Sequence, residues 1–284
     1  MSKDWDIDFI SRDDFKSHVE KTIKKYIENF QAMDVTTFNK NVVDPIKMLF
    51  DKSIYHKTWE TIINEEIARQ RDKSNMNGIG YFHQNIFSYI KNCEVPPNGS
   101  GGFDVIYTVK DKIQIPDDTD TVSSIYVEMK NKHNTMNSAS ASDTYKKMKD
   151  KILDDDDCYC ALVEVIANHS QNIKWKQKDK TTGKTSEHKR IRRMSIDKFY
   201  EIVTGDKDGF YKICMALPSI IDELLIELKS ELHTPEDSVI PDLQQMATNK
   251  GIEDKTSDDA YLISVFLLGF DEYNGFHDED NDNK

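Results

Sequence analysis

The chain has 284 residues, and its 51 Asp and Glu outnumber its 38 Lys and Arg, which gives a formal net charge of −13. Its 13 Phe, 12 Tyr and 3 Trp exclude an intrinsically disordered chain. No apolar run approaches the ~18 residues of a membrane span, and residues 1–6 lack the basic and apolar regions of a signal peptide, so we expect a soluble, intracellular, globular protein.

The first hundred residues are predicted to be helical. Ser11 can cap a helix that runs to residue 31, with Asp14 three positions further on. A third helix is expected over 79–90, before Pro96-Pro97 and a glycine-rich stretch end helical structure. Between them a second helix is expected over 53–70, where apolar side chains recur at helical spacing: Trp59, Ile62, Ile63 and Ile67.

The middle of the chain changes to strand patterning. Residues 103–109 and 124–128 are β-branched or alternate in polarity, and a polar loop over 114–121 separates them. A helix over 143–153 then precedes residues 158–167, which are almost continuously apolar, as expected of a strand covered on both faces.

The remaining segments are a pair of polar strands, 171–178 and 188–194, and helices over 196–203, 210–232 (kinked at Pro218) and 258–270. The fold class is therefore α/β, with a central mixed sheet flanked by helices. We expect an N-terminal helical region (1–100), an α/β core (101–232), and C-terminal helices with an acidic tail (233–284), together forming one compact domain. The tail, 271–284, holds six acidic residues and one basic residue, so a solvated segment is favoured over a partner-binding one.

Four cysteines, at 93, 158, 160 and 214, are too few and too irregularly spaced for a disulfide framework. The one-residue gap between Cys158 and Cys160 puts both thiols on one face of a strand and is not zinc-finger spacing. We expect buried thiols in a reducing compartment rather than metal ligands.

One Asp, one Glu and one Lys can converge on neighbouring strands. Glu128 and Lys130 end a short apolar strand, and alternation places them on the same face. Asp104 lies near the start of the preceding strand. Two carboxylates supply the hard oxygen ligands that Mg²⁺ prefers, with positions left for water and a phosphate. A lysine beside them can orient and help deprotonate the attacking water and stabilise charge on the phosphate.

The Glu-x-Lys spacing alone carries little information in a chain that is 31% charged, and it recurs at Glu187, Glu227 and Glu253. The copy at 128–130 differs because it follows an apolar strand and has Asp104 upstream on a second strand. The alternative is an edge strand with a solvated Glu/Lys face.

Residues 102–105 (GFDV) and 127–137 (VEMKNKHNTMN) resemble the PD-(D/E)xK nuclease superfamily. More narrowly, they resemble type II restriction endonucleases of the Eco47II kind, which cut GGNCC-class sites. Residues 80–87 and 145–148 strengthen the resemblance, which covers roughly residues 60–225. Phe103 stands where the name-giving proline of the superfamily would be.

The resemblance implies a restriction-endonuclease-like core and Mg²⁺-dependent, sequence-specific double-strand cleavage of DNA in the bacterial cytoplasm. It implies that Asp104 and Glu128 bind the metal and that Lys130 acts on the water. A carboxylate from the helix before the core often joins such sites. Glu66 (or Glu65) is the candidate here, and an exposed helix carboxylate is the alternative.

Basic residues are concentrated between 174 and 193, where nine Lys or Arg stand against Asp179 and Glu187, a local charge of +7. This density predicts phosphate contacts and DNA binding that weakens steeply with salt, although a solvated hairpin would also explain it. Trp175 is expected to pack under the strands rather than to stack.

Direct base readout needs bidentate donors and acceptors. Two segments qualify, the one that leaves the strand of Glu128 and the basic one, and their candidates for DNA binding are Lys132, His133, Asn134, Asn137, Lys174, Lys176, Arg190, Arg192 and Arg193. Half-sites related by a dyad predict a homodimer with one active site per DNA strand.

Two other functions stay open. One is a repair or modification-dependent nuclease on the same scaffold, which would not give discrete bands from unmodified plasmid. The other is a non-catalytic DNA-binding protein on a decayed nuclease fold, which would show no metal-dependent turnover.

Overall fold

The computed structural model describes residues 5–97, 102–133, 135–178, 183, 185–229 and 235–269. The chain divides into two compact units, residues 1–24 with 77–229 and residues 25–76 with 230–284. Two helices, α1 (Arg12–Asn29) and α4 (Trp59–Asn85), contribute residues to both units. Each unit therefore combines segments that are distant in the sequence.

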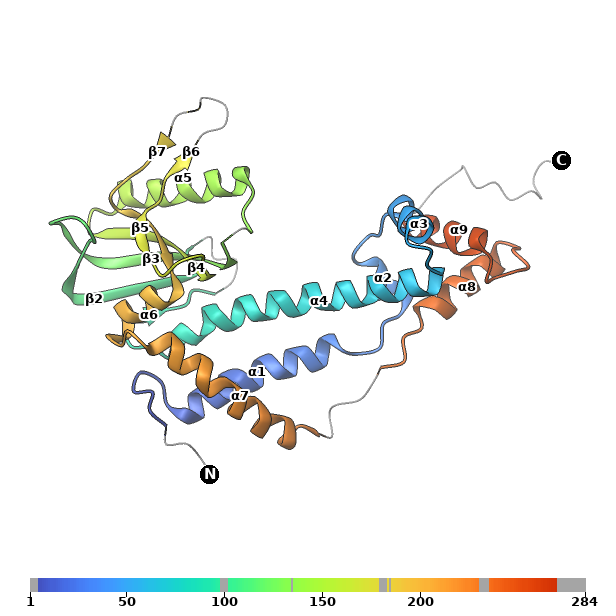
Figure 1. Cartoon of the computed structure of the whole chain (residues 1–284), viewed down its shortest axis with the longest axis horizontal. Helices are drawn as coiled ribbons and strands as arrows, with labels where there is room; N and C mark the ends of the chain where they lie inside the picture. Colours follow the sequence, from blue (N-terminus) through green and yellow to red (C-terminus); the bar gives the residue numbers. More distant parts are fainter. Residues whose placement is uncertain are drawn as a thin grey trace. The chain divides into compact units, whose positions relative to one another are not determined.

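The first unit contains a mixed sheet (Figure 1). Its described strands follow the order β1-β2-β3-β4-β8-β5. The neighbours β3, β4 and β8 run parallel, whereas β1–β2, β2–β3 and β8–β5 are antiparallel. The strands are β1 (Cys93–Glu94), β2 (Val105–Gln114), β3 (Thr121–Lys132), β4 (Cys158–Ile166), β5 (Asn172–Lys174) and β8 (Ile191–Ser195). The predicted α/β class with a central mixed sheet is confirmed.

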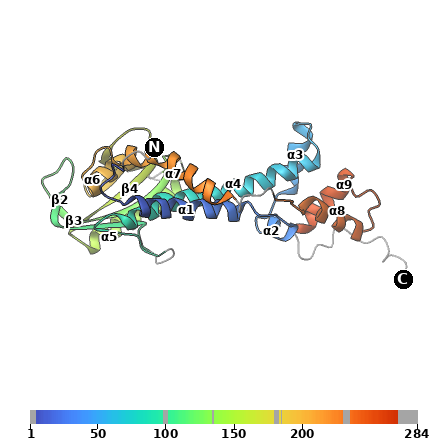
Figure 2. The same ribbon diagram turned by 90° about the horizontal axis from the view of Figure 1, so that it is seen from below.

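Helices cover both faces of this sheet (Figures 1 and 2). One face packs against α5 (Ser138–Asp154), and the other against α6 (Ile196–Thr204), α7 (Gly209–Glu227), the adjacent parts of α1 and α4, and the 3₁₀-helix η1 (Ile86–Tyr89).

Strand β4 shows why the sheet needs cover on both faces. Tyr159 and Val163 belong to the core shared with α1, α4, α6 and α7, while Cys158, Cys160 and Leu162 pack with α5 on the opposite face. Alternation along a strand sends successive side chains to opposite faces, so a strand that is apolar at every position is buried on both. The predictions for this strand and for two buried thiols on one face are both confirmed.

The second unit is helical in its described part. It contains α2 (Val35–Asn39), α3 (Pro45–Ile54), α8 (Val239–Asn249), α9 (Asp258–Leu268) and parts of α1 and α4. The predicted stripe of Trp59, Ile62, Ile63 and Ile67 is buried and packs with side chains of α8 and α9. None of the helices in the described ranges has the length and apolar character needed to cross a membrane.

The two helices expected over 53–70 and 79–90 are one continuous helix, α4, which ends at Asn85. The segment between them has no proline, and a single glycine, Gly78, costs a helix only about 1 kcal/mol. Helix α7 likewise continues through Pro218. Helices α2, α3 and α8 were not predicted. The carboxylates of Asp34 and Asp44 cap α2 and α3.

The basic segment also differs from the expected pair of polar strands. β5 does pair with β8, but four of the five residues of β8 are buried, since β8 lies between β4 and β5 in the sheet. A separate two-stranded ribbon is formed by β6 (Gln177–Lys178) and β7 (Thr185–Ser186). The acidic tail lies outside the described residues.

Candidate active site

Asp104 and Glu128 face each other across the β2–β3 pair. Val105 lies opposite Val127 in the antiparallel register, so Asp104, one residue before β2, is in line with Glu128. The backbone N–H of Asp104 donates to the carbonyl of Val127 at 2.8 Å. In return, the Asp104 carboxylate Oδ2 accepts from the N–H of Met129 at 2.7 Å. Strand pairing thus brings the two carboxylates to one place.

Two lysines hold the Glu128 carboxylate. Lys130 lies two residues further along β3, on the same face, and its Nζ is 2.9 Å from Glu128 Oε1. Lys147 comes from α5, and its Nζ is 2.8 Å from Oε2. Both oxygens of this carboxylate therefore accept a charge-assisted hydrogen bond.

The two carboxyl groups have opposite electrostatic environments. Burial raises the pKa of Asp104, the hydrogen bond from Met129 opposes this, and the nearby charge of Glu128 adds to the rise. Burial would also raise the pKa of Glu128, but hydrogen bonds from Lys147 and Lys130 outweigh it, so that this pKa is lowered overall. Glu128 is consequently ionised at neutral pH. Burial and the charge of Glu128 make the ionised form of Asp104 less stable.

The donor set suits a hard divalent cation. Within the described ranges, no group of three or more His, Cys, Asp or Glu side chains is arranged to hold a metal ion. A site on Asp104 and Glu128 would therefore offer two carboxylates and leave the other positions to water, backbone carbonyls and substrate. Mg²⁺ is commonly bound in this way, by one or two carboxylates plus water and substrate phosphates, whereas a structural Zn²⁺ site requires four protein ligands.

Two residues that touch this site were not among the predicted site residues, although both lie in segments 80–87 and 145–148, which strengthen the family resemblance. Lys147 is one of several lysines on α5, and only the phase of the helix, which buries Tyr145 and Met148, turns it toward Glu128. Gln84, near the end of α4, donates from Nε2 to the backbone carbonyl of Asp104 at 3.2 Å. Both contacts depend on how helices pack on the sheet, which no local spacing reveals.

Glu66 lies in the part of α4 that belongs to the second unit. Its carboxylate accepts two hydrogen bonds from the guanidinium of Arg69 and one from Gln70. Its neighbour Glu65 is exposed and pairs with Lys57 at 2.6 Å. The α4 residue that contacts Asp104 is Gln84, and a role of Glu66 in the site stays a prediction.

The candidates at the end of β3 and directly after it differ in exposure and in hydrogen bonding. Lys132 is exposed at the end of the strand. His133 is half-buried, and its backbone N–H donates to the carbonyl of Ile166 at 3.1 Å. Asn137 is the N-cap of α5, where its Oδ1 accepts from the N–H of Ser140 at 2.8 Å. Asn134 lies outside the described residues.

The three arginines of the basic segment are bound to protein acceptors. Arg190 donates to the backbone carbonyl of Asp156 at 2.8 Å. Arg193 forms a bidentate pair with the buried Glu164, at 2.6 and 2.9 Å. Arg192 is 0% exposed and donates to both the carbonyl and the side chain of Asn172. Its contact with DNA stays a prediction, which this burial disfavours because a base edge or a phosphate could reach the guanidinium only after a rearrangement.

The lysines of the same segment are more accessible. Lys176 is exposed and pairs with the exposed Glu187 at 3.4 Å, and Lys174 is half-buried on β5. Trp175 between them is 5% exposed and packs edge-to-face on Tyr145, with ring centroids 5.4 Å apart. The prediction that Trp175 packs rather than stacks on bases is confirmed.

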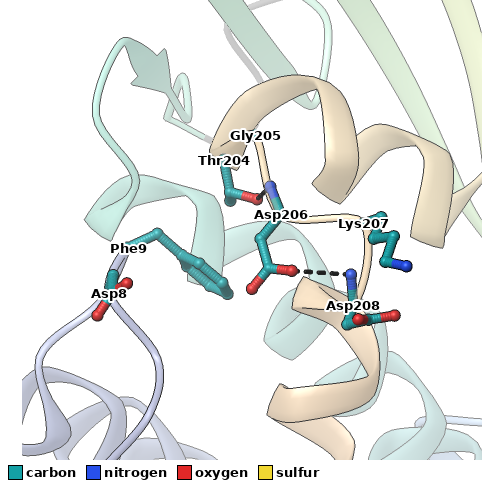
Figure 3. A pocket seen from close by; sticks show the side chains of 7 residues that line it. All are labelled: Asp8, Phe9, Thr204, Gly205, Asp206, Lys207 and Asp208. Atoms are coloured by element: carbon teal, nitrogen blue, oxygen red, sulfur yellow. Dashed lines mark hydrogen bonds between the residues drawn. The ribbon is translucent and has the colours of Figure 1, made fainter.

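A surface hollow of about 430 Å³ lies elsewhere in the first unit, beside the turn between α6 and α7 (Figure 3). It is lined by Asp8, Phe9 and residues 204–208. The Asp206 carboxylate accepts from the N–H of Asp208 at 2.9 Å and pairs with Lys212 at 2.8 Å. These contacts stabilise the turn, and none of the predicted site residues lines the hollow.

Comparison with known proteins agrees with this geometry. The family model for the Eco47II restriction endonuclease matches residues 7–226. The type II restriction enzyme Sau96I of Staphylococcus aureus is 28% identical over 223 residues, covering 76% of this chain and 80% of the relative. The type II restriction enzyme Eco47II of Escherichia coli is 29% identical over 230 residues, covering 78% and 89%. Since the family match spans well over half of the chain and includes the β2–β3 pair with both carboxylates, the chain belongs to the Eco47II restriction endonuclease family.

Proposed function

We propose that this protein is a type II restriction endonuclease that makes Mg²⁺-dependent double-strand breaks in DNA at a GGNCC-like palindrome. The observation that carries the proposal is the convergence of Asp104, Glu128 and Lys130 on the β2–β3 pair. Family membership supports the reaction class, and the names of the two relatives support the type II assignment.

In this proposal Asp104 and Glu128 hold the ion. Mg²⁺, when bound, supplies positive charge that offsets the charge developing on the scissile phosphate. The Lys130 ammonium is positioned beside Glu128, where it orients the attacking water and its positive charge makes that water easier to deprotonate. The water oxygen forms a bond to phosphorus as the bond from phosphorus to the 3′ oxygen breaks, and the products are a 5′-phosphate and a 3′-hydroxyl.

DNA contacts are proposed for the accessible basic and polar groups. Lys132 is the last residue of the strand of Glu128 and His133 follows it directly, which supports a position for both beside the cleaved phosphate. Lys174 and Lys176 can contact phosphates from the basic segment, which offsets the repulsion expected between DNA and a protein of net charge −13. Because a palindrome presents two equivalent strands, we propose that the protein acts as a homodimer, in the bacterial cytoplasm.

The test is digestion of unmodified plasmid with Mg²⁺, followed by sequencing of the ends. We expect discrete fragments whose ends share one palindrome, and no cleavage with EDTA. Asp104→Asn should abolish cleavage, whereas the matched control Glu94→Gln, an exposed carboxylate on β1 of the same sheet, should leave it unchanged. Cleavage by the Asp104→Asn protein at the wild-type rate would refute the assigned site.

A further inference from the structure

We propose that Lys147 is a second lysine of this site, a positioning residue that occupies one oxygen of Glu128 in the metal-free protein and yields it when a divalent ion binds. This inference rests on the proposed function, because it takes Asp104 and Glu128 as the metal ligands. It assigns to α5 a part in the active site that the Asp–Glu–Lys pattern of β2 and β3 does not contain.

Three contacts fix the Lys147 ammonium. It lies 2.8 Å from Glu128 Oε2 and donates to the backbone carbonyl of Gly102 at 2.8 Å. It also lies 4.5 Å from the centre of the Phe103 ring, within the range of a cation–π contact. Gly102 and Phe103 lead directly into Asp104, so one side chain links Glu128 on β3 with the segment that carries the other carboxylate.

Metal binding should change these contacts, because the charge of a divalent ion repels both ammonium groups. Both oxygens of Glu128 accept from a lysine, so an ion that binds Glu128 competes with an ammonium group for an oxygen. Lys147 can release Oε2 and stay in place, because the Gly102 carbonyl and the Phe103 ring still hold it. We therefore assign the release to Lys147 and leave Lys130 on Oε1, two residues away on the same strand.

The charges of the site explain what this arrangement achieves. Without metal, the ammonium groups of Lys130 and Lys147 balance the carboxylates of Asp104 and Glu128. A divalent ion then enters a site that is already neutralised, and the positive charge of Lys147 weakens its binding. Removing one positive charge a few ångströms from the ion should strengthen binding about tenfold, even at a dielectric constant close to that of water.

The experiment measures Mn²⁺ binding to the DNA-free protein by electron paramagnetic resonance of the free ion, beside cleavage assays with Mg²⁺. Mn²⁺ is suitable because carboxylate and water ligands bind it as they bind Mg²⁺. Lys147→Met should bind Mn²⁺ about tenfold more tightly than the wild type and cleave at least tenfold more slowly. Lys147→Gln, which keeps hydrogen-bond donors but no charge, should also bind Mn²⁺ more tightly, and it replaces the Met variant if that one fails to fold.

Two controls complete the design. Lys147→Arg keeps the positive charge and should bind Mn²⁺ like the wild type. Lys146→Met removes an exposed lysine from the adjacent position of α5 and should change neither Mn²⁺ binding nor cleavage. Unchanged or weaker Mn²⁺ binding in both neutral variants would overturn the proposal, since a merely structural lysine cannot strengthen metal binding when it is removed.

Asp104→Asn separates this proposal from the proposed function. If Asp104→Asn loses Mn²⁺ binding while both neutral Lys147 variants bind the ion like the wild type, the role of Lys147 fails and the metal site stands. If Asp104→Asn binds Mn²⁺ as tightly as the wild type, the metal site itself is misassigned and both proposals fail.

Discussion

The carboxylate of Asp104 accepts the backbone N–H of Met129 at 2.7 Å, which fixes it against the strand that carries Glu128. This position is costly in the absence of metal, because burial raises the pKa of Asp104 and the charge of Glu128 adds to the effect. A raised pKa means that the folded state holds the proton more tightly than the unfolded state. Ionisation therefore destabilises the fold progressively as the pH rises from the unfolded-state pKa to the folded-state pKa, and in full above it.

The first prediction concerns this cost. Asp104→Asn should raise the stability of the metal-free protein by about 1 kcal/mol at neutral pH while it abolishes cleavage, because active-site charges trade stability for function. An Asn side chain can still accept from Met129. Thermal unfolding in EDTA measures the gain, which should shrink as the pH is lowered and Asp104 of the wild type becomes protonated. A lower melting temperature for the variant at neutral pH would show that the Asp104 charge does not destabilise the folded state.

The second prediction separates catalysis from binding at Lys130. Lys130→Ala should reduce cleavage to background, because the group that orients the water is lost, while binding to a target duplex is retained. Fluorescence anisotropy with labelled duplex measures binding, and single-turnover cleavage measures the chemical step. If Lys130→Ala loses DNA binding together with cleavage, Lys130 is a DNA contact instead.

The β2–β3 part of the site could be predicted because its determinants are local. Alternation along a strand places Glu128 and Lys130 on one face, and the preceding strand brings Asp104 beside them. The contribution of α5 could not be predicted, since several of its lysines are equivalent in the sequence and only helix packing selects Lys147. The burial of Arg192 could not be predicted for a similar reason, because its partners, Asn172 and Asp117, lie 20 and 75 residues away in the chain.

The third prediction concerns Arg193, whose partner Glu164 is 2% exposed. Arg193→Ala leaves the buried carboxylate without its bidentate partner. Breaking a fully buried pair costs roughly 3–5 kcal/mol, and because a third of the Arg193 side chain is exposed, we expect a loss of about 2 kcal/mol. Chemical denaturation of the metal-free protein measures this loss.

Lys176→Ala is the matched control for Arg193. Its ion pair with Glu187 is exposed on both sides, so stability should change by less than about 1 kcal/mol. If Lys176 contacts a phosphate, the slope of log K against log salt for DNA binding should fall by about 0.9. The opposite pattern, a stable Arg193→Ala protein with weakened DNA binding, would identify Arg193 as a DNA contact rather than a structural group.

The last prediction concerns His18 on α1, which is buried against α4 with its Nε2 2.9 Å from the carbonyl of Phe82. Burial and the nearby charge of Lys21 together lower the pKa of His18 to about 4, although the hydrogen bond to the Phe82 carbonyl opposes them. The unfolded chain binds the proton near the ordinary value of about 6.5, so stability is full above that pH and is lost as the pH falls from about 6.5 toward 4. The shift corresponds to about 3 kcal/mol.

His18→Gln should therefore lose less stability between pH 7 and pH 5 than the wild type, as measured by urea denaturation at each pH. Burial also lowers the pKa of His83 to about 4, so the His18→Gln protein should retain part of the pH dependence of stability. His169→Gln, an exposed control, should follow the wild type, and a His18→Gln protein with the full wild-type pH dependence would assign the acid sensitivity to other groups.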